Sequence, residues 1–289
     1  MIDAHLHLWE KQQGLVSGLP VYDLGGGRSQ FGSEIRQMLP PYMTDGRNTV
    51  DRLLANMDFA QVAGAVVTQE YIDGCQDDYL RRIRQEHPLR LRVSALYREK
   101  PLGDVGWADG IKICAGRLAD PDLTKLDDVF AMARHLDLFI GLDLADGDTQ
   151  TGSLREMILQ YPDVRIAIGH FGMVTRPNWQ EQIKLARFPR VFIESGGITW
   201  LFNSEFYPYP SAVRAILEAR DLCGMEKLMW GSDYPRTMTV ITYRMSWDFV
   251  DKSQLLTEEE KRLFLHGNAK GFYRFSNLPE TPYVHHMAE

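Results

Sequence analysis

The most constraining feature of this sequence is the regular alternation of short apolar runs with longer amphipathic stretches. Short continuous runs rich in Val, Ile, Leu and Phe are typical of strands that are buried on both faces. Such runs occupy residues 1–8, 64–69, 91–97, 110–114, 138–144, 165–170, 190–195 and 227–233. The spacing of the apolar residues predicts helices over 48–64, 77–88, 123–137, 151–162, 178–189 and 211–224. The segment after the third run shows little helical pattern.

Repeated strand–helix units of this kind predict an α/β fold. Eight units in about 250 residues match the size of a (β/α)8 TIM barrel. The alternative is a doubly wound sheet, which usually carries a Gly-rich phosphate turn after its first strand. The Gly-rich segment 22–28 (YDLGGGR) instead lies within the long stretch 10–47, with no helix directly behind it. We expect a flexible active-site loop there. After the last strand, residues 256–275 predict C-terminal helices separated by a turn at 266–268.

The sequence shows no sign of a division into several domains. No linker rich in Pro, Gly or Ser divides it, so residues 1–289 are expected to form a single domain. Residues 279–289, which include His285 and His286, are expected to be a loosely packed tail. The net charge is −7, so there is no basic excess to attract nucleic acid or a membrane surface.

Cysteine usage and the apolar runs predict the compartment. Cys75, Cys114 and Cys223 are widely spaced, which argues against a disulfide scaffold and suits a reducing compartment. No apolar run reaches the roughly 18 residues of a membrane span. The first residues lack the pattern of a secretory signal. We therefore expect a cytoplasmic protein.

Four polar residues stand at the ends of predicted strands. His5 and His7 are two residues apart in the first strand, so their side chains point to the same face. His170 and Asp233 end the sixth and eighth strands. The carboxyl ends of the strands hold the active site in barrels of this class. A single histidine or aspartate at such a place is usually structural, but four buried together would have to be paired or bound to a ligand.

Other strand residues are open to two interpretations. Lys112 and Glu194 could bind substrate or form structural ion pairs inside the barrel. In the fifth strand, alternation places Phe139, Gly141 and Asp143 on one face. The small Gly141 suits a crowded barrel centre, so Asp143 is expected to point inward. Three tryptophans are expected to serve packing, namely Trp9, Trp200 and Trp230.

Four segments in order, IDAHLHLW, IGHFG, WGSDYP and the closing segment 256–275, resemble the amidohydrolase superfamily. The resemblance is to its amidohydrolase-related (amidohydrolase 2) branch. Within that branch the sequence is most similar to lactonase-like members, the sugar-acid lactonases and 2-pyrone-4,6-dicarboxylate lactonase. The motifs span nearly the whole chain. The resemblance implies a distorted (β/α)8 barrel, in agreement with the strand pattern.

The resemblance also implies a metal centre. Members that use a metal bind Zn²⁺ or Mn²⁺ through residues that correspond here to His5, His7 and Asp233. His170 corresponds to a histidine that transfers protons or polarises a carbonyl. The fifth strand carries Asp143 (or the nearby Asp146) in place of a further metal-binding histidine. We therefore expect one divalent ion, Zn²⁺, weakly bound or absent, with Asp143 as an additional candidate ligand.

The expected function is a hydrolase that opens a lactone, a cyclic ester, of a sugar acid or of an aromatic breakdown product. Asp233 would be the general base for the attacking water. His170, with His5 or His7, would polarise the carbonyl directly or through the metal. The substrate is expected to be a small molecule, and a homo-oligomer is compatible with the sequence. Candidate substrate-binding residues are Lys112, Arg117, Glu194 and Arg236.

Two other functions stay open. One is a metal-dependent nonoxidative decarboxylase of the same branch, similar to aminocarboxymuconate-semialdehyde decarboxylase. The absent fifth-strand histidine argues against it, because this chemistry needs a firmly bound metal. The other is a noncatalytic barrel, against which the intact set of histidines and aspartate argues. Substrate specificity is expected to come from the stretch 10–47.

Overall fold

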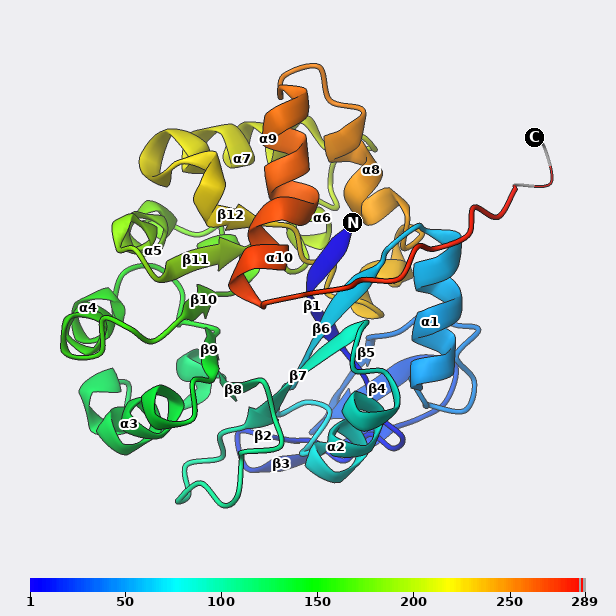
Figure 1. The fold of residues 1–289 in the computed structure, drawn as a ribbon. Coiled ribbons are helices and arrows are strands. Elements are labelled where there is room, and N and C mark those ends of the chain that lie inside the picture. The colour runs from blue at the N-terminus through cyan, green and yellow to red at the C-terminus, as the bar shows by residue number, and fades with distance from the viewer. Residues whose placement is uncertain (286, 288–289) are drawn as a thin grey trace.

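The computed structural model describes residues 1–285 and residue 287. Within this part, eight parallel strands follow one another around a barrel in the order in which they occur in the sequence (Figure 1). They are β1 (Ile2–His7), β6 (Gly64–Thr68), β7 (Leu91–Leu96), β8 (Gly110–Ile113), β9 (Phe139–Leu142), β10 (Ile166–Ile168), β11 (Val191–Glu194) and β12 (Leu228–Met229). The predicted TIM barrel is confirmed.

Backbone hydrogen bonds between the first strand and the segment after the last one bring the barrel close to closure. Ala4 N–H donates to Trp230 O, and Asp233 N–H donates to His5 O, both at 2.9 Å. All six residues of β1 are buried. Strands covered on both faces need apolar residues in both directions, which is why the apolar runs locate them so well.

Helices lie on the outside of the ring of strands (Figure 1). The six predicted helices are α1 (Val50–Phe59), α2 (Asp77–Glu86), α3 (Asp127–His135), α4 (Thr151–Gln160), α5 (Trp179–Lys184) and α7 (Pro210–Cys223). Short α-helices follow β11 and the β12 region, namely α6 (Ile198–Leu201) and α8 (Met245–Asp251). Short 3₁₀ turns are η1 (Ala115–Arg117), η2 (Leu123–Leu126), η3 (His170–Gly172), η4 (Leu185–Arg187), η5 (Met225–Lys227) and η6 (Arg236–Thr239). As predicted, the connection from β7 to β8 is not helical.

The C-terminal helices differ from the prediction. Helix α9 (Glu258–Arg262), the π-helical turn η7 (Leu263–Gly267) and α10 (Asn268–Phe272) follow one another without a break. The turn expected at 266–268 is wrong, because Gly267 and Asn268 keep helical backbone angles. The Asn268 side chain donates hydrogen bonds to Met225 O and Leu228 O, both at 2.7 Å. These bonds tie the helix to the barrel where the sequence suggested a break.

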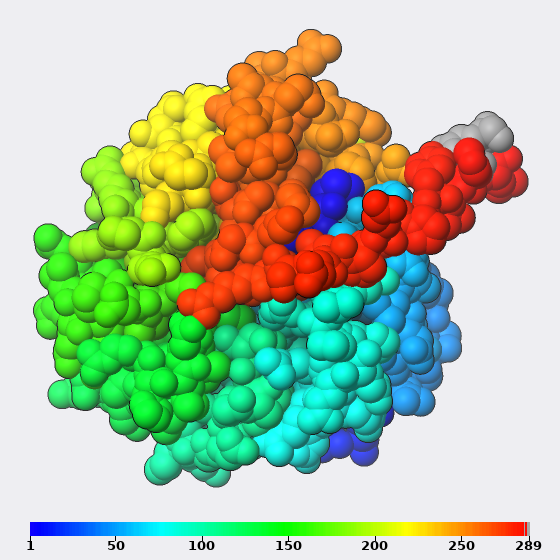
Figure 2. Space-filling view, viewed as in Figure 1, coloured from blue at the N-terminus to red at the C-terminus, as the bar shows by residue number. Residues whose placement is uncertain are grey.

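Helix α10 closes the amino end of the barrel. Its Phe272 joins a cluster with Ile2, Val66 and Phe139, which come from three different strands. Figure 2 shows the C-terminal segment covering the centre of this face. The carboxyl end of the barrel is therefore the end left for ligands. Residues 279–285 of the expected tail form no helix or strand, while His286 lies outside the described residues.

The stretch 10–47, expected to be a loop, folds into a four-stranded antiparallel sheet. Its strands are β2 (Leu15–Val16), β3 (Leu19–Asp23), β4 (Arg28–Phe31) and β5 (Glu34–Gln37). Residues 25–27, the predicted flexible glycines, make the turn between β3 and β4 with φ of 75°, 59° and 74°. Glycine reaches such angles without steric cost. We name residues 10–47 the insertion sheet.

None of the helices in the described residues combines the length and apolar character that crossing a membrane would require.

Candidate active site

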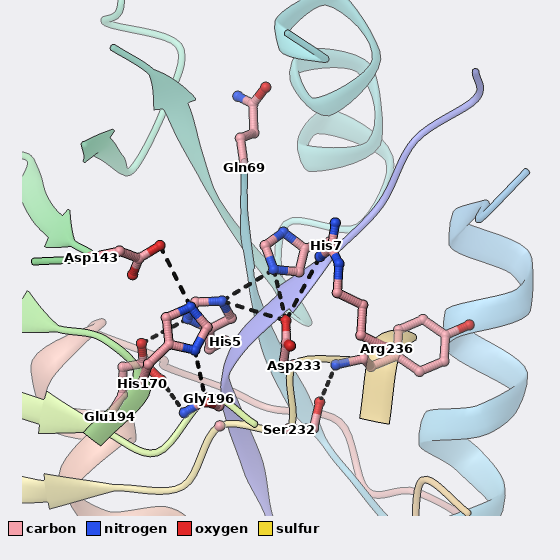
Figure 3. A network of polar contacts seen from close by, with 12 residues as sticks. His5, His7, Gln69, Asp143, His170, Glu194, Gly196, Ser232, Asp233 and Arg236 are labelled. Carbon is pink, nitrogen blue, oxygen red and sulfur yellow. Dashed lines mark hydrogen bonds and ion pairs between the residues drawn. The ribbon is translucent and has the colours of Figure 1, made fainter. Parts of the chain in front are cut away.

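The structure brings His5, His7, His170 and Asp233 together at the carboxyl end of the barrel (Figure 3). We name these four residues the His–Asp cluster. His5 Nε2 lies 3.1 Å from His7 Nε2, and His7 Nε2 lies 2.9 Å from Asp233 Oδ1. The rings of His5 and His170 have centroids 4.7 Å apart. The two histidines of β1 therefore share a face, as their spacing predicted.

The backbone at two of these residues is left-handed. His170 has a φ of 53° and Asp233 a φ of 58°. Such angles are uncommon for residues other than glycine and persist where the surrounding structure enforces them, often at functional sites. His170 comes two residues after β10 and Asp233 four residues after β12, so both lie in connections at the carboxyl end of the barrel.

Asp3, which was not predicted as a site residue, holds the turn that carries Asp233. Its carboxylate accepts hydrogen bonds from Ser232 N–H at 2.9 Å and from the Tyr243 hydroxyl at 2.8 Å. It is fully buried. Burial raises the pKa of Asp3 to about 6, although these hydrogen bonds oppose the shift. An acidic residue inside an apolar first strand was the available signal.

Glu194 lies behind His5. His5 Nδ1 donates to Glu194 Oε1 at 2.7 Å, and Gly196 N–H donates to Glu194 Oε2 at 2.6 Å. Both carboxylate oxygens are thus occupied within the protein. Of the two interpretations left open for Glu194, substrate binding and a structural pair inside the barrel, the structure shows the structural pair. The contact orients the His5 ring so that Nε2 faces the cluster.

Asp73 takes the corresponding place behind His7. Asp73 Oδ2 lies 3.7 Å from His7 Nδ1, and the Arg236 guanidinium contacts both oxygens of Asp73 at 2.7 Å. Arg236 was predicted to bind substrate, but its charge is already paired. Asp73 was not predicted, because it lies after β6 and only the fold brings it to β1.

Trp200 of α6 hydrogen-bonds Asp233. Its indole N–H donates to Asp233 Oδ2 at 2.8 Å, a contact that the expected packing role did not include. Trp9 and Trp230 are fully buried, as predicted. With Oδ2 held by Trp200, Asp233 Oδ1 is the oxygen that faces the histidines.

Asp143, the residue after β9, points inward, as the alternation along the predicted fifth strand indicated. Its Oδ1 accepts from Lys112 Nζ at 2.5 Å, and its Oδ2 lies 3.6 Å from His170 Nε2. Lys112 is 2 % exposed. The structural ion pair therefore describes Lys112 better than the predicted contact with substrate.

His170 has a strongly perturbed pKa. Burial alone would lower the pKa of its ring, but the carboxylates of Asp143, Asp233 and Glu194 raise it to about 10. Its Nδ1 donates to Gly196 O at 2.8 Å. A charged imidazole at this position leaves the Nε2 proton facing Asp143 and the barrel mouth.

A cavity of about 720 Å³ opens over the cluster, lined among others by His7, His170, Trp200, Asp233 and Arg117. Its volume lies within the range of about 300–1,000 Å³ that is typical for small-molecule sites. Arg117, predicted to bind substrate, lines the cavity and pairs with Glu70 at 3.0 Å. The cluster is therefore accessible to a small molecule.

The donor atoms of the cluster fit a metal ion. One nitrogen each of His5 and His7 and one oxygen of Asp233 lie within 4.8 Å of one another. Asp233 Oδ1 is buried and makes no well-aligned hydrogen bond within the described part of the chain. Burial lowers the pKa of His7 well below its usual range, and the nearby Arg236 acts in the same direction. A neutral ring is the form that binds metals.

Two nitrogens and one carboxylate oxygen with an open side are typical ligands of catalytic zinc. Carboxylates behind metal-binding histidines are usual as well. A second grouping of possible ligands joins His5, His170 and Asp143. The inward Asp143 is thus close enough to take part, as the sequence analysis allowed.

Several solved structures share this fold. A probable 2-pyrone-4,6-dicarboxylic acid hydrolase from Acinetobacter baumannii has a TM-score of 0.72 at 19% identity, over 95% of this chain and 99% of that chain. An amidohydrolase from Burkholderia multivorans with bound zinc has a TM-score of 0.67 at 16% identity, covering 96% and 99%. Amidohydrolase 2 from Bifidobacterium longum subsp. infantis has a TM-score of 0.60 at 22% identity, covering 95% and 98%.

No curated protein sequence matches the chain significantly. The family model described as amidohydrolase matches residues 2–275. That range contains all four residues of the His–Asp cluster and the closing helices. The chain therefore belongs to the amidohydrolase family.

Proposed function

We propose that this protein hydrolyses a lactone, the cyclic ester of a sugar acid or of an aromatic breakdown product. The observation that carries the proposal is the convergence of His5, His7 and Asp233 on one point below an open cavity, with His170 beside them. The similarity to a probable 2-pyrone-4,6-dicarboxylic acid hydrolase supports the same reaction class.

Asp233 is proposed to take a proton from the attacking water. Burial would raise the pKa of Asp233, but the neighbouring His7, Arg236 and His170 lower it well below its usual range. The side chain is therefore a carboxylate at neutral pH. Trp200 holds Oδ2, so Oδ1 is the oxygen in position to accept the proton.

His170 is proposed to stabilise the negative charge that develops on the lactone carbonyl oxygen. Its ring is positively charged and lines the cavity. The bond to Gly196 O fixes the ring. A donor held ready in a water-poor site stabilises an oxyanion without having to reorganise.

We propose His5, His7 and Asp233 as the ligands of one divalent ion, with Zn²⁺ as the ion that best suits the donors. When bound, such an ion lowers the pKa of its water and polarises a carbonyl. Three protein ligands without a thiolate hold zinc less firmly than a structural site does. Glu194 would act through His5, by keeping its Nε2 free of a proton.

The experiment is a substrate screen of the purified protein with sugar-acid lactones, pyrone carboxylates and aromatic acids. Ring opening releases a proton and consumes one ester, whereas decarboxylation releases CO₂. We expect acid release without CO₂, lost after chelation and restored by Zn²⁺. Release of CO₂ would favour the decarboxylase. Zinc binding without turnover of any lactone would contradict the proposed hydrolysis.

A further inference from the structure

The predicted anion-binding cations are already neutralised in the structure. Lys112 pairs with Asp143 and Arg236 pairs with Asp73. An acidic substrate would have to break a buried ion pair to use either of them, and leaving a buried charge unpaired is costly. A carboxylate or phosphate on the substrate is therefore better served by other cations.

A second cavity adjoins the first. It has a volume of about 660 Å³ and shares Gly116 and Arg117 with the cavity over the His–Asp cluster. One wall is the start of the insertion sheet, residues 13–18. The opposite wall is formed by the ends of β7 and β8 with their following residues, including Arg98 and Lys100. The two cavities are therefore neighbours at Gly116 and Arg117.

The walls of the second cavity are held in place by the backbone. Gln13 N–H donates to Asp73 O at 3.1 Å, and Leu15 N–H donates to Tyr71 O at 2.9 Å. The Tyr71 hydroxyl donates to Tyr97 O at 3.0 Å, which links the segment after β6 to the residue after β7. The cavity is thus formed before a ligand arrives, which reduces the entropy that binding costs.

The charges of this cavity are unbalanced. Arg98, Lys100 and Arg117 line it, with Glu99 as the acidic residue among the lining residues. Arg117 already pairs with Glu70 at 3.0 Å, which leaves Arg98 and Lys100 beside Glu99. Glu99 accepts the Ala119 N–H at 2.8 Å. Among residues 1–285 and 287, no carboxylate lies within ion-pair distance of Arg98 or Lys100. These two exposed cations are available to an anion.

We propose that the second cavity binds an anionic group, a carboxylate or a phosphate, which the substrate carries beyond its lactone ring. This inference rests on the proposed hydrolysis and narrows its substrate class to elongated acidic lactones. The ring lies over the His–Asp cluster, the chain passes Arg117, and the distal anion meets Arg98 and Lys100. Charge-assisted hydrogen bonds of this kind are about twice as strong as neutral ones.

The kinetic test removes one charge at a time. Arg98→Gln and Lys100→Gln are each compared with Arg155→Gln, which removes an exposed arginine from α4. With a lactone that bears a distal carboxylate, each cavity variant should raise KM about tenfold and keep kcat, since a tenfold change corresponds to one good polar contact. The Arg155 variant should match the wild type. An unchanged KM in both cavity variants would overturn the proposal.

A binding test separates this proposal from the proposed hydrolysis. Calorimetric titration of the full chain with glutarate and with inorganic phosphate should show binding that Arg98→Gln and Lys100→Gln each weaken about tenfold. Tighter binding of one probe identifies the anion as carboxylate or phosphate. Binding of a probe by a protein that opens no lactone would reject the hydrolysis alone. Binding of neither probe would reject the second cavity as an anion site.

Discussion

Asp233 is held on every side by contacts that no single stretch of sequence contains. Trp200 holds one oxygen, His7 lies against the other, and Asp3 fixes the turn through Ser232. Because Trp200 donates to Oδ2, Oδ1 is the oxygen of this carboxylate that is left to accept a proton. In the proposed reaction, Asp233 Oδ1 is therefore the atom that accepts the proton.

Replacement of Asp233 by Asn should keep the fold and abolish most turnover. The carboxamide has nearly the same shape but cannot accept the proton, so kcat should fall by about 10²–10⁴-fold. Steady-state kinetics on the best lactone of the screen measures the loss, and circular dichroism checks the fold. Asp221→Asn on the exposed end of α7 is the matched control. Turnover of the Asp233 variant close to that of the control would exclude Asp233 as the base.

In the proposed metal site, Glu194 would act on the ion only through His5. Glu194→Gln removes the charge that holds the His5 Nδ1 proton. Loss of such a partner typically weakens metal binding about 10–100-fold. Zinc affinity, measured by competition with a chromophoric chelator, should fall by this factor, whereas Glu156→Gln on exposed α4 should leave it unchanged. Equal affinities for the two variants would show that Glu194 does not position His5.

At the scale of elements, the insertion sheet is joined to the barrel by close backbone contacts. A Cβ on Gly14 would lie 1.8 Å from Ile72 O and 2.6 Å from Tyr71 O. These are backbone atoms, which cannot rotate out of the way as a side chain can. The glycine is thus what allows the segment of residues 13–18 to lie against the connection after β6 and form the wall of the second cavity.

Gly14→Ala should therefore loosen the insertion sheet while the barrel stays folded. Overpacking of this kind costs about 1–3 kcal/mol, and here the sheet can relieve it by moving away. Limited proteolysis with mass spectrometry should show faster cleavage within residues 10–47. Gly103→Ala is the control, since nothing lies within 4 Å of its added Cβ. The same cleavage rate in both variants would contradict the anchoring role.

At the scale of the whole molecule, the two ends of the barrel differ in structure. The carboxyl end carries the His–Asp cluster, and the amino end is plugged by α10 and its aromatic side chains. Asn268 fastens α10 to η5 and to the first residue of β12 through two buried hydrogen bonds. Stability and chemistry are thus separated along the barrel axis.

Asn268→Ala should lower stability and leave the chemistry intact. It leaves the Leu228 carbonyl without this partner, at a cost of about 1–3 kcal/mol for a buried group left unsatisfied, whereas Met225 O still accepts the Leu228 N–H. Scanning calorimetry should show a lower melting temperature, while kcat well below that temperature stays at the wild-type value. Asn203→Ala, at an exposed position, should melt like the wild type. A melting temperature equal to that of the control would show that Asn268 does not fasten the helix.

The strands of the barrel and their polar ends could be predicted from the sequence alone. A strand that is buried on both faces appears in the sequence as a short apolar run. A polar residue at the end of such a run is therefore easy to recognise. His5, His7, His170 and Asp233 were identified in this way, and the parallel barrel brings them together. The i, i+2 spacing of the first two is enough to place them on one face.

Only the tertiary structure decided the partners of these residues. Glu194 lies behind His5 and Trp200 contacts Asp233, although each pair is separated by tens or hundreds of residues in sequence. The insertion sheet escaped prediction because its short strands are largely exposed and carry no apolar run. The spacing of apolar residues in the sequence indicates which face of one helix or strand is buried. An ion pair or a cavity wall depends instead on the distance between two elements. That distance is set by how the eight strands close around one another.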